Sequence, residues 1–162
     1  DLFNLFVFFE ILLLASYGLL VHGGGLVRAR AGIAYVVLNL SGSALFLIAL
    51  GLLYGFLGTL NMADFGTRLQ LVAPEDQGVV AVTCALLVTV FLLKAAVLPI
   101  GFWLPHVYTA ATLPVAALFV IMTKVGIYAL LRVVTIGLLA TPWSAGLLQP
   151  WLTWLALGTI AI

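Results

Sequence analysis

The stretch Phe91–Pro105, FLLKAAVLPIGFWLP, decides the fold of this chain. An apolar run that carries Lys94 is followed at once by Pro99, Gly101 and Pro105. Proline lacks a backbone donor and clashes with the carbonyl four residues earlier, so a helix must kink or break here. Irregular backbone is tolerated in a bilayer only where it is buried in protein or lines a water-filled cavity. The stretch therefore predicts a broken membrane helix with an enclosed break.

The composition also indicates a membrane protein. Of 162 residues, 65% are hydrophobic and 7% are charged, and the mean hydropathy is +1.34. Soluble domains carry roughly 25% charged residues. A net charge of +1 provides no basic patch for nucleic acid, and the single cysteine, Cys84, cannot form a disulfide within the chain. Two isolated histidines give no metal-ligand spacing, so we expect neither a metal site nor a cofactor.

The apolar runs predict an all-α, polytopic membrane helix bundle with about five transmembrane segments. We expect one transmembrane domain that is an internal piece of a longer protein, because the chain starts without a Met and ends within an apolar run. A polar loop is expected over 58–77 and a turn over 141–146. The G-x-x-x-G motif of Gly51 and Gly55 allows close approach of membrane helices and predicts packing inside the same subunit. The expected spans are 2–22, 32–57, 77–98 with a second piece at 102–111, 113–139 and 147–162.

Three charged residues lie deep in the expected helices, whereas the other eight lie in loops or near helix ends. The three are Glu10, Lys94 and Lys124, and each costs about 2.5–3.5 kcal/mol at a helix centre. Lysine can release its proton when it is removed from water, and arginine cannot. Both deep cations are lysines and every other cation is an arginine, which favours proton translocation. Two alternatives remain open: a structural ion pair of Glu10 with Lys94, and Lys124 anchored to free carbonyls.

One histidine near the break is a candidate proton relay. His106 directly follows Pro105, and an imidazole exchanges protons near neutral pH. The alternative is a polar side chain that only fills the hydrated break.

Three motifs, each centred on one deep charge, resemble a single family. They are LFVFFE at 5–10, FLLKAAVLP at 91–99 with FWLP at 102–105, and TKVGIYALLR at 123–132. They resemble the antiporter-like subunits shared by respiratory complex I, membrane-bound hydrogenases and the Mrp (Pha, Mnh) cation/proton antiporters. Within this family, VLNLSGSALFL at 37–47, GTLNMAD at 58–64 and WLPH at 103–106 are similar to D-type Mrp subunits in particular.

The resemblance implies a fold of about fourteen helices with two inverted repeats, of which this chain covers about a third. It implies that Glu10 tunes the proton affinity of Lys94 and that protons then pass through water to Lys124. His106 follows Pro105 directly, unlike the loop histidine of complex I subunits, so the resemblance assigns it no role.

The function implied is a proton-translocating subunit of a multisubunit Na+(K+)/H+ antiporter. It would be a transporter subunit rather than an enzyme, in the bacterial inner membrane, with the other antiporter subunits as partners. The first alternative is an antiporter-like pump subunit of complex I or of a membrane-bound hydrogenase. The second is a purely structural membrane module.

Overall fold

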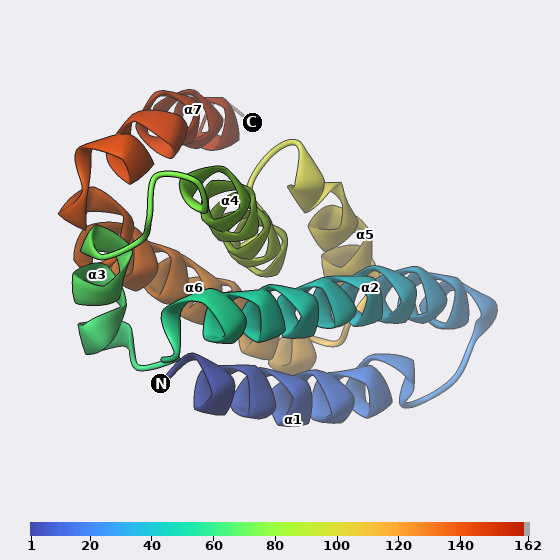
Figure 1. The fold of residues 1–162 in the computed structure, drawn as a ribbon. Helices are drawn as coiled ribbons and strands as arrows, with labels where there is room; N and C mark the ends of the chain where they lie inside the picture. The colour runs from blue at the N-terminus through green and yellow to red at the C-terminus, as the bar shows by residue number, and fades with distance from the viewer. Residues whose placement is uncertain (161–162) are drawn as a thin grey trace.

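The computed structural model describes residues 1–160, with the side chains of 147–149 excepted. In this part of the chain every regular element is a helix, and the bundle is shown in Figure 1. The elements are α1 (Leu2–Val21), α2 (Leu26–Leu57), α3 (Met62–Gln70), α4 (Gln77–Lys94), the 3-10 helix η1 (Ile100–Phe102), α5 (Trp103–Ala110), α6 (Leu113–Ile136), the 3-10 helix η2 (Leu138–Ala140) and α7 (Pro142–Ile160).

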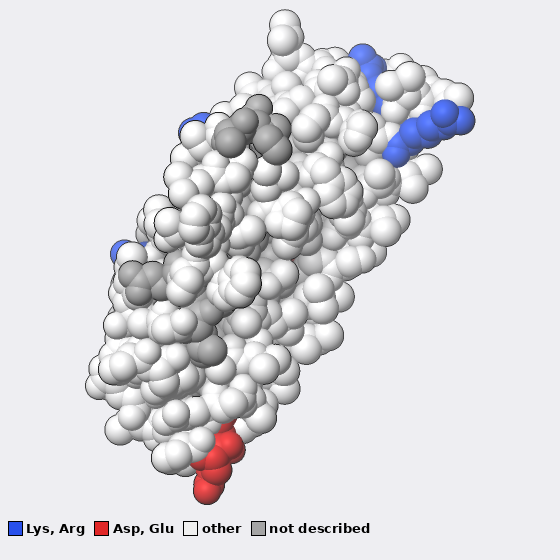
Figure 2. All heavy atoms as spheres, turned by 90° about the horizontal axis from the view of Figure 1, so that it is seen from above, with Lys and Arg blue, Asp and Glu red and all other residues white. Residues whose placement is uncertain are grey.

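Four of these helical stretches are long and apolar enough to cross a membrane: Leu2–Val21, Leu26–Leu57, Gln77–Lys94 and Leu113–Ala140. Large apolar side chains are exposed along them, as expected of surfaces that face lipid or further helices. Figure 2 shows one face of the molecule, where the visible Asp and Glu gather at one end and most Lys and Arg lie toward the other. The all-α polytopic membrane bundle expected from the sequence is confirmed.

Helix α4 lies at the centre of the bundle and packs against α2, α6 and α7. Aromatic residues join the helices, because edge-to-face rings pack densely and favourably in a core. Phe46 of α2 meets Phe91 of α4 with ring centroids 5.2 Å apart, and Tyr35 of α2 meets Phe119 of α6 at 5.2 Å. Both ring pairs are fully buried, so they fix α2 against the helices that carry the two deep lysines.

Helix α2 begins at Leu26, six residues before the expected start at 32. The loop expected between the spans 2–22 and 32–57 is therefore only a short connection, which contains Gly23–Gly25, each with positive φ. Arg28 stabilises this earlier start, since its Nε donates to the carbonyl of Ala110 at 3.2 Å and its Nη1 to that of His22 at 3.0 Å. One arginine thus joins the ends of α1, α2 and α5.

The loop expected over 58–77 contains a short helix, α3, that the sequence interpretation missed. The Asn61 side chain caps it by accepting from the amide of Ala63 at 2.9 Å. Phe65 and Leu69, one turn apart, are buried against the bundle. At nine residues this amphipathic helix depends on tertiary packing, which is why polar composition concealed it.

Helix α4 ends at Lys94, four residues before the expected end at Leu98. The amide of Val97 donates to Leu92 and that of Ala96 to Leu93, which is the Schellman pattern. Ala96 occupies the left-handed position with φ of 55°, where glycine is usual. The helix therefore closes before Pro99, and the second piece begins with η1 and continues as α5.

The turn expected over 141–146 is also absent, because α7 begins at Pro142. Thr141 precedes it, and its Oγ1 accepts from the amide of Ser144 at 3.4 Å, while proline suits the first helical position. The expected fifth segment, 147–162, thus starts earlier than predicted, and its last two residues lie outside the described part of the chain.

Within the described residues, α4 and α6 come into close contact at Gly126. A Cβ added at Gly51 or Gly55 would meet no described atom within 4 Å, so the described residues do not supply the close packing expected at this motif. A Cβ at Gly126 would lie 2.7 Å from the amide nitrogen of Ala95 and 2.8 Å from the carbonyl carbon of Lys94. Gly126 therefore lets α6 touch the end of α4.

Candidate functional site

The candidate site is centred on Lys94, the last residue of α4, directly before the break. Its side chain is only 2% exposed, whereas that of Glu10, on α1, is 27% exposed. Because α4 is the central helix, its end projects the lysine between α1 and α2. Glu10 and Lys94, whose pairing the sequence left open, are therefore neighbours.

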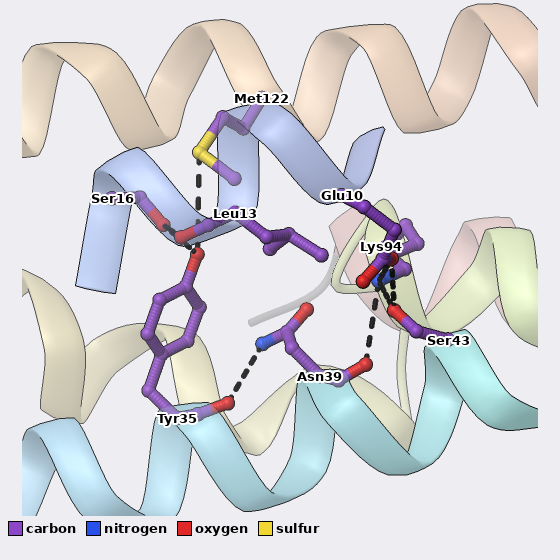
Figure 3. A network of polar contacts seen from close by, with 8 residues as sticks. All are labelled: Glu10, Leu13, Ser16, Tyr35, Asn39, Ser43, Lys94 and Met122. Carbon is purple, nitrogen blue, oxygen red and sulfur yellow. Dashed lines mark hydrogen bonds and ion pairs between the residues drawn. The ribbon is translucent and has the colours of Figure 1, made fainter. Parts of the chain in front are cut away.

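Helix α2 supplies the direct hydrogen-bond partners of the lysine (Figure 3). Lys94 Nζ donates to Ser43 Oγ at 2.9 Å and to the backbone carbonyl of Asn39 at 3.4 Å. The Ser43 hydroxyl in turn donates to Glu10 Oε1. Lys94 Nζ lies 4.0 Å from Glu10 Oε1, which is an ion-pair distance but too long for a hydrogen bond. The charges are thus joined through a hydroxyl group.

The surroundings of the lysine are otherwise apolar. The Phe9 ring centroid lies 6.0 Å from Lys94 Nζ, within range of a cation–π attraction. The Asn39 side chain turns away from the lysine and donates to the carbonyl of Tyr35 at 3.0 Å. The ammonium is therefore held by few polar groups in a low-dielectric setting, where each contact is strong.

Two side chains bond to backbone groups beside the break, one of which, the carbonyl of Leu93, also accepts from the amide of Ala96. Trp103 Nε1 of α5 donates to the carbonyl of Leu93 at 3.3 Å. The amide of Leu98 donates to Thr159 Oγ1 of α7 at 3.1 Å. Since unpaired backbone groups are costly in a membrane, these contacts allow the chain to break beside Lys94.

A second buried polar cluster lies nearer the α1–α2 connection, also visible in Figure 3. The Ser16 and Tyr35 hydroxyl oxygens are 2.9 Å apart, and Ser16 donates to the carbonyl of Leu13 at 2.7 Å. Tyr35 Oη lies 4.0 Å from the sulfur of Met122. The side chain of Leu13 lies between this cluster and Lys94, so the two polar groups are separate.

Lys124 is not brought to this site. It lies in the middle of α6 and is exposed, as is Tyr128 one turn later. The ion pairs of the described residues do not include its ammonium, and no described carbonyl accepts a hydrogen bond from it.

His106 is also separate from Lys94. It is exposed on α5 and lines a groove of about 390 Å3 together with Arg30 and Thr109. The groove lies between α5 and the start of α2, close to the helix ends. Within the described residues, no hydrogen bond or ion pair joins His106 to Glu10 or Lys94.

Sequence reasoning missed Ser43 and Asn39 as members of the site. Serine and asparagine in apolar helices usually bond to the preceding turn, so their residue type alone carried no signal. Their spacing did carry one. Asn39 and Ser43 are four residues apart, so they lie on the same face of α2 and present polar groups at neighbouring levels.

The whole chain, residues 1–162, matches the transmembrane family described as NADH:quinone oxidoreductase/Mrp antiporter. The chain belongs to this family. Its relatives include the D-type subunit of a probable K(+)/H(+) antiporter from Rhizobium meliloti, 50% identical over 99% of this chain and 30% of the relative. Another is the D-type subunit of the Na(+)/H(+) antiporter from Bacillus subtilis, 45% identical over 84% of this chain and 27% of the relative. The chain thus spans about a third or less of these family members, which are bacterial.

Solved structures of large membrane complexes contain the same fold. The Mrp complex from Dietzia sp. DQ12-45-1b matches with a TM-score of 0.72 at 38% identity, over 83% of this chain and 25% of that one. The archaeal membrane-bound sulfane sulfur reductase, a respiratory complex, matches with a TM-score of 0.82 at 34% identity, over 96% and 31%. This family member is therefore a multi-pass membrane protein, and its bacterial relatives indicate the bacterial inner membrane.

Proposed function

We propose that this chain is part of a proton-translocating subunit in a multisubunit monovalent cation/proton antiporter, and that Glu10 and Lys94 carry the proton. The observation that supports the proposal most is the buried Lys94, joined through Ser43 to Glu10, at the break of a membrane helix. The relatives' names specify K+ in one case and Na+ in another, so the cation class is monovalent.

The chemistry of the pair fits proton exchange better than static support. A buried ion pair is weak evidence for stability, because apolar replacements often do as well. Lysine becomes neutral by releasing one proton and glutamate by binding one, so each member of the pair can take up and release a proton. Lys124 would receive the proton through water, with His106 as a candidate relay near the α5 groove. The other subunits of the complex would be the partners.

The test uses the complete antiporter in inside-out membrane vesicles, with proton release measured on addition of Na+ or K+. Lys94→Met and Glu10→Gln are each expected to abolish antiport while the complex still assembles. Arg68→Ala is the matched control, because this arginine makes only an exposed pair with Asp64 at 3.2 Å. Antiport at the control rate in Lys94→Met would refute the proposal.

A redox-driven pump subunit is the second candidate, supported by the match to the archaeal respiratory complex. It uses the same residues but a different energy source. Neighbouring genes for small antiporter subunits favour the antiporter, whereas neighbouring genes for iron–sulfur and quinone-reducing proteins favour the pump.

A further inference from the structure

Ser43 occupies an unusual place for a helical serine. Hydroxyls in apolar helices commonly donate to the carbonyl one turn back, as Ser41 does to Val37 at 2.8 Å and Thr83 to Val79 at 2.8 Å. The Ser43 hydroxyl donates instead across to Glu10 on α1. The Ser43 hydroxyl therefore makes no bond to its own helix, and its hydrogen-bond partners are the two charged residues, Glu10 and Lys94.

The groups around Lys94 differ in whether they can pass a proton on. The carbonyl of Asn39, 3.4 Å from Nζ, can only accept a hydrogen bond. The Glu10 carboxylate is 4.0 Å away and does not touch the ammonium. The Ser43 hydroxyl, 2.9 Å from Nζ, is both an acceptor and a donor. Among the described groups in contact with Nζ, only this hydroxyl can relay a proton.

In the described part of the chain, Lys94 is less exposed than Glu10. Its side chain is 2% exposed and Ser43 is buried, whereas Glu10 is partly exposed on the α1 side. Within the described residues, the hydrogen-bonded connection from Glu10 to the lysine runs through Ser43.

We propose that the Ser43 hydroxyl transfers the proton between Glu10 and Lys94, an inference that rests on the proposed function. When Glu10 is protonated and Lys94 is neutral, the Glu10 O–H gives its proton to Ser43 Oγ as the Ser43 O–H gives its own to Lys94 Nζ. The products are a carboxylate, an ammonium and an unchanged hydroxyl. The reverse transfer breaks an N–H bond of Lys94 and reforms the Glu10 O–H, so atoms and charge balance in both directions.

The test compares variants of equal shape in the complete antiporter. Threonine and valine at position 43 have nearly the same shape and differ in the hydroxyl. Ser43→Thr is expected to keep most of the transport rate, whereas Ser43→Val and Ser43→Ala should each lower it by about a hundredfold, the low end for a positioned proton-transfer group. Ser41→Ala is the matched control on the same helix, with an exposed hydroxyl that bonds only to its own turn.

Each result decides the matter. Wild-type rates in Ser43→Ala or Ser43→Val would overturn the inference, and so would an equally slow Ser43→Thr, since packing rather than the hydroxyl would then matter. The proposed function is judged separately by Lys94→Met. If that variant is inactive while Ser43→Ala is normal, only the role of Ser43 fails. If Lys94→Met transports normally, the proposed function fails as well.

Discussion

The two deep lysines of this chain have opposite surroundings. Lys94, at the end of α4, is buried and bonded to Ser43 and Asn39, whereas Lys124, in the middle of α6, is exposed. Gly126 touches the backbone of Lys94, and two residues rotate a helix by about 200°, so Lys124 points away from this contact. The chain therefore supplies partners for one lysine, and the described residues supply none for the other.

The largest effect is expected when both members of the buried pair, Glu10 and Lys94, are replaced together. We expect Glu10→Gln combined with Lys94→Met to abolish antiport completely, because no group remains to hold the proton. Assembly should be at least as good as in Lys94→Met alone, since no buried charge is left without its partner. Antiport is measured in vesicles and assembly by co-purification of the other subunits. Retained transport in an assembled double variant would favour a purely structural module.

The second lysine gives the next largest effect. In the complete protein, Lys124→Met and Lys124→Arg should both lose most antiport, because the proposed relay needs a lysine that releases its proton. Arg132→Lys is the control, as this residue is exposed on the same helix near its end. Normal transport in Lys124→Arg would limit proton handling in this chain to Lys94.

A smaller effect, on stability, is expected from a substitution at the contact between α4 and α6, the helices that carry the two deep lysines. Gly126→Ala would place a methyl group 2.7 Å from the amide nitrogen of Ala95, so α6 must move away from the end of α4. We expect a loss of stability of about 1–3 kcal/mol, as for other overpacked sites. Thermal unfolding of the purified protein measures it, and an unchanged midpoint would show that the helices are less tightly packed than described.

The smallest effect is expected at Gly51, which serves as the counterpart of Gly126. Nothing described lies within 4 Å of a Cβ at this helical position. Gly51→Ala should therefore stabilise the protein by about 0.5–1 kcal/mol through helix propensity and leave antiport unchanged. The same unfolding experiment tests it. A destabilised Gly51→Ala would reveal a packing partner on this face.

Much of this arrangement could be predicted from the sequence. The hydropathy runs predicted the all-α membrane bundle. The cost of unpaired charge in a membrane singled out Glu10 and Lys94 but left open whether they pair with each other. The helix ends were harder. Pro99 predicted a break, but the Schellman hydrogen bonds around Ala96 end α4 before the proline. Such hydrogen bonds depend on the conformation of the folded backbone, which the sequence pattern does not reveal.

The third member of the site, Ser43, was missed, although its spacing from Asn39 places both on one face of α2. Ser43 looks like any small polar residue in an apolar helix, and only the register of α2 against α1 and α4 gives it two charged partners. The sequence also did not predict that Lys124 is exposed, because a lysine at the centre of a membrane helix is expected to be buried or paired.

The central claim is that Lys94 releases and rebinds a proton, and Lys94→Arg tests it most directly. Arginine keeps the positive charge but does not deprotonate in proteins. In vesicles that contain the complete antiporter, Lys94→Arg is expected to lose cation-driven proton release almost as fully as Lys94→Ala. Near-normal antiport in Lys94→Arg would contradict the account, because a fixed charge would then be sufficient.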